Sequence, residues 1–274
     1  MTSPWTEIAD RVFVRRYAFV DQNIVTILGD GVALVVDSRT TYPQAREILD
    51  DLRALGSPRV GVVVNTHGHW DHAFGNRAFR PAVIWGHERC ATMVAMTGDA
   101  QRTEAAVHLS AGELADLDEV VLDPPDRVFA DRAVVELGGR LVDLAYLGRG
   151  HTDNDIVITV RDADILLAGD LLENGATASF SDGYPMDWPV TAQALLELVG
   201  SATVVVPGHG DHAGRDFVES QLAGFRAIAA LAARVAVGDL DLEAAITLAP
   251  YPAPDARAPL ERALAQLRDD LAGR

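Results

Sequence analysis

The first third of the chain is built from short β-branched segments that turn residues separate. The helix in this region is predicted from apolar residues at helical spacing that stop at Gly56. Residues 60–64 are apolar throughout, as in a strand buried on both faces, and a shorter strand follows at residues 82–85. Strands are predicted over residues 11–20, 23–28, 32–37, 60–64 and 82–85, and a helix over residues 43–55.

The remainder of the chain begins with a less regular interval. It then shows a second block of predicted strands that helices follow. Residues 87–127 have weak periodicity and predict only a few short helices. The pair Gly138-Gly139 predicts a hairpin between two of the later strands. After Gly214 the pattern is helical, with breaks at Asp239 and at a linker over residues 250–259. Strands are predicted over residues 133–137, 141–147, 155–160, 164–168 and 203–206, and a helix over residues 191–199.

Two blocks of strands, each followed by helices, predict an α/β protein in which two sheets pack together with helices outside. The hydrophobic share of 49% in 274 residues is ample for one full core. We therefore expect a single domain, 1–274, with a core over 11–213 and a helical C-terminal extension over 214–274. The C-terminal helices are most simply packed on that core, and a contact between copies in a homo-oligomer is the alternative.

Charge and composition narrow the classes of function. The formal charge is -17, from 40 acidic and 23 basic residues, and every basic residue is arginine. The absence of lysine excludes Schiff-base and phosphate-loop lysine mechanisms. So acidic a chain predicts no nucleic-acid partner and no anionic membrane surface as a partner.

The single cysteine, Cys90, excludes an internal disulfide and a cysteine zinc cluster, which fits a reducing compartment. Residues 1–20 show no secretory pattern, and no run approaches the ~20 apolar residues of a membrane helix. A cytoplasmic protein is therefore expected.

Three of the eight histidines fall within six residues, directly after the strand predicted at 60–64. They form the pattern His67-x-His69-x-Asp71-His72. Imidazole nitrogen and carboxylate oxygen suit Zn²⁺, Fe²⁺ or Mn²⁺. One tight turn can direct several of these side chains to a common point, so the segment predicts a metal site.

Three further candidates follow later strands. His151 lies in Gly-Arg-Gly-His-Thr, Asp170 ends an apolar run, and His209 lies in Pro-Gly-His-Gly. Open α/β architectures place their sites at strand ends, so we expect these side chains near the histidine cluster. The neighbouring glycines permit tight backbone turns beside a crowded centre.

The order of these motifs resembles the metallo-β-lactamase superfamily. His-x-His-x-Asp-His, Gly-His-Thr, Gly-Asp and Gly-His follow one another between residues 12 and 209, after a strand-end aspartate, Asp37. The resemblance implies a four-layer αββα sandwich with metals at one edge. In the ligand set that it implies, His67, His69 and His151 hold one metal, Asp71, His72 and His209 hold the second, and Asp170 bridges them. Asp37 would orient a ligand or a loop.

The resemblance also implies a reaction. Two ions, expected to be Zn²⁺ with Fe²⁺ or Mn²⁺ as alternatives, would provide a metal-bound hydroxide that attacks a small ester, thioester, lactone or amide. Asp71 would orient the nucleophile and take part in proton transfer. A mononuclear iron oxygenase similar to the persulfide dioxygenases is the alternative with the same fold. An alternative of another class is a non-catalytic metal-binding or scaffold protein.

Particular residues separate the branches of the superfamily. Asp170 excludes the branch with a cysteine ligand, and His69 disfavours flavodiiron proteins, which have glutamate there. The charge disfavours the nucleases of the superfamily.

Several residues near these motifs are weaker candidates for a role. The aromatic segment 173–189, with Tyr184 and Trp188, predicts a wall over the substrate, and packing on the core is the alternative. Arg149 would bind an anionic substrate or lie on the surface. His212 would stand behind a ligand or in a loop. The two other histidines are expected outside the site, His87 at a helix start or at the surface and His108 exposed to solvent.

Overall fold

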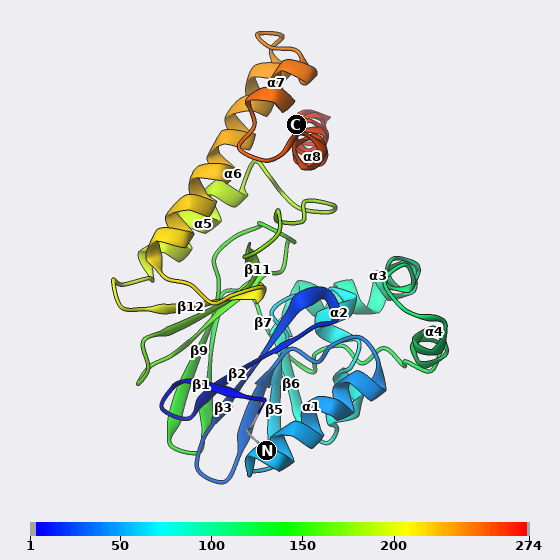
Figure 1. Ribbon diagram of the computed structural model, residues 1–274, viewed down its shortest axis with the longest axis vertical. Helices are drawn as coiled ribbons and strands as arrows, with labels where there is room; N and C mark the ends of the chain where they lie inside the picture. The colour runs from blue at the N-terminus through cyan, green and yellow to red at the C-terminus, as the bar shows by residue number, and fades with distance from the viewer. Residues whose placement is uncertain (1–3, 273–274) are drawn as a thin grey trace.

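The structure is a computed structural model that describes residues 4–272. The two ends of the predicted domain 1–274, residues 1–3 and 273–274, lie outside the described residues. The predicted sheets are present as two groups of strands (Figure 1). The first group consists of β1 (Thr6–Ala9), β2 (Val12–Tyr17), β3 (Gln22–Leu28), β4 (Ala33–Val36), β5 (Val60–Val64), β6 (Val83–His87) and β7 (Arg127–Phe129). The second consists of β8 (Arg132–Leu137), β9 (Arg140–Tyr146), β10 (Ile156–Val160), β11 (Ile165–Glu173) and β12 (Val204–His209).

The strand order is β7-β6-β5-β4-β3-β12-β11-β10-β9-β8, with β2 and β1 continuing from β3. The two groups meet through a single register pair, His209 with Gln22. Strands β4 to β7 are parallel, and β8 to β11 are antiparallel. The hairpin predicted at Gly138-Gly139 is present between β8 and β9, and both glycines have positive φ.

Three apolar clusters show how the layers are stacked. One lies between the two strand groups and includes Val25 and Leu34 from the first and Leu144 and Ile158 from the second. A second covers the outer face of the first group beneath α1 (Tyr42–Leu55). A third covers the outer face of the second group beneath α5 (Trp188–Glu197) and α6 (Arg215–Ala236). The order helix, sheet, sheet, helix confirms the four-layer αββα sandwich.

The C-terminal helices extend away from the sandwich (Figure 1). The far half of α6 packs with α7 (Leu242–Leu248) and α8 (Ala253–Ala272) around Ile228, Ala256 and Leu260. The predicted linker over residues 250–259 is therefore wrong, because α8 already begins at Ala253 and includes Pro259. Packing of this apolar face outweighs the one backbone hydrogen bond that the proline removes. No helix within residues 4–272 combines the length and apolar character of a membrane span.

The interval 87–127 also differs from expectation. It contains one long helix, α3 (Glu88–Ala106), followed by α4 (Ala111–Asp118) and strand β7. The buried face of α3 is formed at helical spacing by Cys90, Val94, Gly98, Gln101 and Ala105. Small and polar side chains occupy much of this face, so hydrophobic periodicity did not reveal the helix.

Candidate metal centre

The histidine cluster follows β5 in a short loop and in the helix α2 (Trp70–Ala73). Buried side-chain amides hold this turn from behind. Asn65 donates to the carbonyl of His72 (2.9 Å), and Gln22 donates to the carbonyl of Asp71 (2.6 Å). The turn is therefore fixed by its backbone, and its side chains are free to converge on the opposite side.

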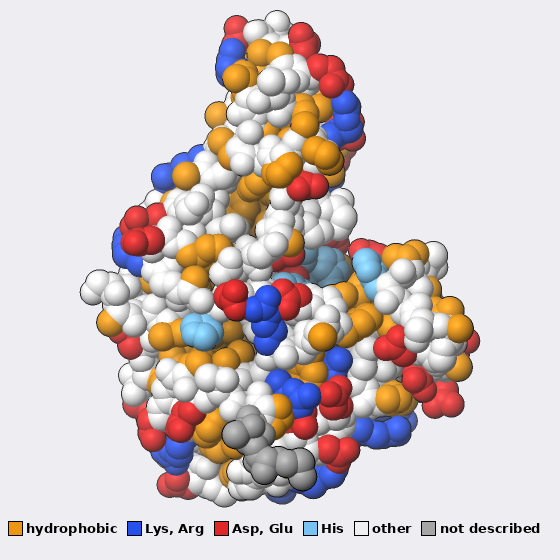
Figure 2. All heavy atoms as spheres, in the orientation of Figure 1, with side chains coloured by type: hydrophobic (Ala, Val, Ile, Leu, Met, Phe, Trp, Pro, Cys, Tyr) orange, Lys and Arg blue, Asp and Glu red, His pale blue; other side chains and the backbone are white. Residues whose placement is uncertain are grey.

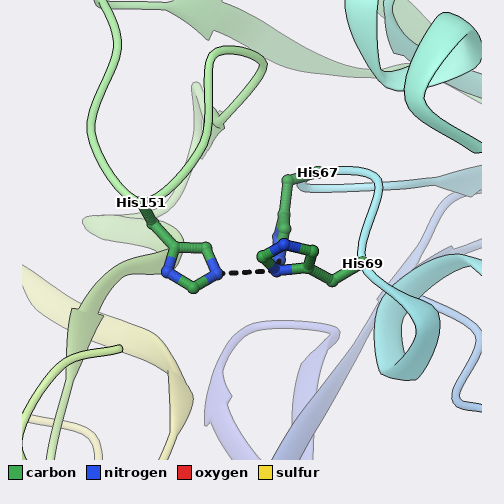
Figure 3. A group of neighbouring side chains, drawn as sticks. All are labelled: His67, His69 and His151. Carbon is green, nitrogen blue, oxygen red and sulfur yellow. Dashed lines mark hydrogen bonds between the residues drawn. The ribbon is translucent and has the colours of Figure 1, made fainter. Parts of the chain in front are cut away.

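His67, His69 and His151 form the first group of side chains that could hold a metal ion, here called the first trio. Nδ1 of His69 lies 3.0 Å from Nε2 of His67 and 2.8 Å from Nε2 of His151. Figure 3 shows the three rings facing one another, with His151 approaching from the loop after β9. Nitrogens that all bind one ion at ~2.0–2.1 Å must themselves lie about this close together.

Asp71, His72 and His209 form the second trio. Nε2 of His72 lies 3.2 Å from Oδ2 of Asp71 and 3.3 Å from Nε2 of His209. Nε2 of His209 is 3.4 Å from the same oxygen of Asp71. Each trio thus takes two side chains from the α2 turn and one from the second strand group.

Asp170, within β11, lies between the trios. Its Oδ2 is 3.6 Å from Nε2 of His151 and 3.3 Å from Nε2 of His209, and its Oδ1 is 3.4 Å from Nε2 of His72. Gly208 permits this approach, because a Cβ there would lie 1.8 Å from Oδ1 of Asp170. Oδ1 is buried and accepts no hydrogen bond from the described residues. A cation between the trios would satisfy it.

The outer ring nitrogens of four histidines each face an oxygen acceptor. Nε2 of His69 meets Oδ2 of Asp182 (3.0 Å), and Nδ1 of His151 meets the carbonyl of Ser179 (3.1 Å). Nδ1 of His72 meets Oδ2 of Asp37 (2.8 Å), and Nδ1 of His209 meets the carbonyl of Val20 (2.6 Å). The outer nitrogen therefore carries the proton, and the inward nitrogen presents a lone pair to the centre.

Asp37 directly follows β4 and is buried, with a positive φ. Besides the contact with His72, its Oδ1 accepts from the backbone N–H of Thr66 (2.8 Å), and its Oδ2 accepts from the hydroxyl of Thr66 (2.9 Å). That hydroxyl also lies 3.1 Å from Nδ1 of His67. One carboxylate therefore orients a ligand of the second trio and the loop that carries the first.

Burial disfavours the charged form of every titratable group in the cluster. Opposite charges nevertheless lie close enough together to outweigh burial at four of them. The Asp170 and Asp71 carboxylates outweigh burial and raise the pKa of His72 and of His209 well above the ordinary value. Conversely, His72 and His209 overcome burial and hold the pKa of Asp71 and of Asp170 well below the usual range. Without metal, the carboxylates keep protons on the nearby imidazoles. A divalent cation can replace these protons, so the donor set fits two such ions.

A cavity of about 220 Å³ opens onto the cluster. His69, Asp71, His151, Asp170 and His209 form part of its lining, which continues over Trp70, Glu104, His108 and Glu173. His108 is exposed, as expected, and it also lies on this wall, stacked on Trp70 with ring centroids 5.5 Å apart. Burial and the Asp170 charge raise the pKa of Glu173 to about 7. Neither His108 nor Glu173 carried a motif that marked it in the sequence.

The predicted substrate contacts are distributed differently from expectation. Trp188 is fully buried, donates its indole N–H to the carbonyl of Leu171 (3.2 Å) and lies behind His151. It is therefore a core residue, which corrects its assignment to the substrate wall. Tyr184 lines a neighbouring hollow. Arg149 pairs with Asp187 and stacks on Tyr184, so its charge is already balanced.

The other predicted histidines lie outside the cluster. His212 lines a separate depression with Arg16 and Asn23, and within residues 4–272 it contacts none of the seven metal-binding residues. The expectation that it stands behind a ligand is wrong. His87 is buried and caps α3, accepting from the N–H of Arg89 (3.2 Å), so of its two expected positions it occupies the helix start and not the surface. Asp182 was missed, because only the folded loop brings it to His69.

Comparison with known proteins places this geometry in a family. The sequence model of the Metallo-beta-lactamase superfamily matches residues 18–209, which include the whole metal cluster. The type 2 metallo-beta-lactamase of Bacteroides fragilis is 37% identical over 101 residues, 36% of this chain and 41% of that protein. The acyl-coenzyme A thioesterase MBLAC2 of Gallus gallus is 30% identical over 210 residues, 68% of this chain and 72% of that protein.

The fold is matched over a larger share of the chain. A metallo-beta-lactamase from Pontibacter korlensis superposes with a TM-score of 0.66 at 21% identity, covering 81% of this chain and 98% of that one. The match to the Bacteroides relative, by contrast, spans less than half of that protein's length. Extent of the family match, fold and motif order agree: the chain belongs to the metallo-β-lactamase superfamily.

Proposed function

We propose that the protein is a hydrolase that binds two zinc ions and cleaves a small ester, thioester, lactone or amide. The observation that carries this proposal is the pair of complete trios with Asp170 between them. A single iron ion would occupy only one of the two trios, so the iron oxygenase does not account for the other. A scaffold protein would account for neither trio. Fe²⁺ or Mn²⁺ would suit the same nitrogen and oxygen donors.

Bound divalent cations would supply Lewis acidity, activating water near neutral pH and polarising a carbonyl group. The residues of the chain provide the rest. The outer acceptors fix the imidazole tautomers, and Asp170 separates the two positions. Oδ2 of Asp71 faces the second trio, while its Oδ1 has no hydrogen-bond donor among the described residues. Oδ1 of Asp71 is therefore available to orient water and to accept its proton.

The surroundings of the centre support a small substrate. A cavity of about 220 Å³ is large enough for the reacting part of a small molecule. The charge of -17 opposes a nucleic-acid substrate. The single buried cysteine, Cys90, is consistent with the cytoplasmic location that we propose.

Metal analysis of the purified protein tests the number and identity of the ions. We expect about two zinc ions per chain. One iron per chain would contradict the proposal and favour the iron oxygenase. The substrate should then be sought with zinc-loaded and iron-loaded protein against acyl-CoA thioesters, β-lactams, lactones, amides and phosphodiesters. The first two classes are taken from the names of the chicken and Bacteroides relatives.

Replacement of Asp71 tests the assignment of the catalytic carboxylate. Asp71→Ala should abolish turnover while circular dichroism shows an unchanged fold. Asp118→Ala, at the exposed end of α4, is the matched control and should retain activity. Activity that survives in Asp71→Ala would refute the proposed role of this carboxylate.

A further inference from the structure

A second hollow, of about 410 Å³, lies next to the metal centre between α3 and the C-terminal helix α8. Met93 and Met96 line it from α3, and Arg262 lines it from α8. Asp182 forms part of the same wall and also accepts the hydrogen bond from His69. The hollow is therefore separated from a metal-binding imidazole by one side chain. Figure 2 shows histidine side chains at the base of the recess between the C-terminal helices and the α3–α4 lobe.

Two guanidinium groups in the lining, Arg89 from α3 and Arg262 from α8, have no acidic partner. No carboxylate within residues 4–272 lies within 4.0 Å of Arg89 or Arg262, although the chain has 40 acidic residues. Both are held by neutral acceptors. Nη1 of Arg89 donates to the carbonyl of Asp153 (3.0 Å) and to the hydroxyl of Tyr146 (3.1 Å). Nε of Arg262 donates to the carbonyl of Gly183 (2.7 Å).

These contacts leave each guanidinium with N–H groups that have no partner among the described residues, Nη2 of Arg89 and both Nη atoms of Arg262. The lining also contains two carboxylates, and each accepts a hydrogen bond from a group other than the two arginines. Asp182 accepts from His69, and Asp153 accepts from the amide of Asn154 (3.0 Å). An incoming anion would therefore find N–H donors on two guanidinium groups that the chain already orients.

The side of the hollow that α3 forms is also apolar and adaptable beyond Arg89. Met96 is 79% exposed, although it is a large apolar side chain on a helix. Met93 packs against Gly68 in the loop between His67 and His69. Unbranched thioether side chains adapt to alkyl chains of varied shape. The hollow thus combines an apolar strip next to the metal centre with cationic groups.

We propose that this hollow binds an alkyl or acyl chain that carries a carboxylate, phosphate or sulfonate, with Arg89 and Arg262 receiving the anion and Met93 and Met96 the chain. This inference rests on the proposed function in one respect: it takes the ligand to be the part of the substrate that does not react. The scissile bond of the substrate would lie in the metal-centre cavity. Its alkyl or acyl chain would pass over the side chain of Asp182 into the hollow.

Calorimetric titration of the metal-loaded protein with octanesulfonate tests this site, because a sulfonate is an anion that ligates zinc poorly. Octanesulfonate should bind, and octanol should bind more weakly by about tenfold or more. Arg89→Gln and Arg262→Gln should each weaken octanesulfonate binding by about tenfold or more, the loss expected for a hydrogen-bonded charge. Arg268→Gln, at an exposed position of α8 outside the hollow, is the matched control and should bind as the wild type does.

The outcomes separate this site from the hydrolase proposal. Arginine-dependent binding without turnover of any ester, thioester, lactone or amide would leave the site standing and refute the hydrolase. Turnover together with octanesulfonate binding that neither Arg89→Gln nor Arg262→Gln weakens would overturn the site alone. No binding of octanesulfonate to the wild type would also overturn it. Since Arg89 is exposed, its replacement gives an answer even if Arg262→Gln destabilises α8.

Discussion

Nδ1 of His72 lies 2.8 Å from Oδ2 of Asp37, and this contact joins the end of β4 to the second trio. Both side chains are buried, so neither has water as an alternative partner. The contact fixes which nitrogen of His72 faces the centre. The affinity for an ion at the second trio should therefore depend on a residue that does not touch the ion.

Asp37→Ala should weaken metal binding at the second trio by roughly 10–100-fold. The loss arises because His72 can then rotate or change tautomer. Titration against a competing chelator measures it, with Asp118→Ala as the control. Unchanged affinity for both ions would show that His72 is held by other contacts.

Gly208→Ala should abolish binding at the bridging position. A Cβ there meets Oδ1 of Asp170 at 1.8 Å, so the carboxylate must move. Overpacking should also destabilise the fold by about 1–3 kcal/mol. Gly112→Ala in α4 is the matched control, because its added Cβ meets nothing within 4 Å. That control should keep its metal and gain about 0.4–1 kcal/mol. Normal metal content in Gly208→Ala would contradict the bridging role of Asp170.

The stabilisation that metal provides should grow as pH rises. In metal-free protein the pKa values of His72 and His209 are raised by Asp170 and Asp71. Their protonated forms therefore stabilise the metal-free fold fully below about pH 6.5, and this contribution is lost as pH rises through the raised values. Metal must displace these protons, so the difference in Tm between metal-loaded and metal-free protein should increase from pH 6 towards pH 8.5.

His212→Ala provides the control for this pH dependence. Its imidazole lies outside the cluster, so the slope of that difference against pH should match the wild type. A wild-type slope of zero would mean that protons and metal do not compete at the two trios.

Trp188→Ala should destabilise the fold by about 3–5 kcal/mol. The indole packs against Phe225 and Phe180, with ring centroids 4.6 Å and 4.9 Å away, and is fully buried. Val190→Ala on the same helix should change stability by less than about 0.5 kcal/mol, because Val190 is 72% exposed. Urea denaturation of metal-free protein measures both. A small change in stability on replacing Trp188 would contradict its role in the core and favour the original assignment to the substrate wall.

The convergence of the seven candidate ligands could be predicted from sequence, because most of it follows from local order along the chain. Four of the seven metal-binding residues share one turn after β5, and His151, Asp170 and His209 lie at or near the ends of apolar segments. A buried strand is visible as an apolar run, so its end is visible too. Motif order then defined the family and with it the sandwich.

Tertiary contacts account for what the sequence did not reveal. Asp182 reaches His69 from a position 113 residues along the chain, with no motif around it. The buried face of α3 includes Gly98, against Leu122, and Gln101, which donates to the carbonyl of Gly68 (3.1 Å). Neither residue type signals burial. Trp188 was misassigned because an aromatic residue near a site looks the same in sequence whether it faces the cavity or the core.

Each trio draws on both strand groups, which pack through an apolar cluster but are paired as strands at one position only. An ion would thus join His69 to His151, 82 residues apart, and a second ion would join His72 to His209, 137 residues apart. A permanent cross-link that closes a loop of this length lowers the conformational entropy of the unfolded chain, which stabilises the fold by about 4–5 kcal/mol. A chain whose one cysteine excludes an internal disulfide can obtain reversible cross-links of this kind from its metals. Chelation would then loosen the seam between the two sheets as well as stop the chemistry.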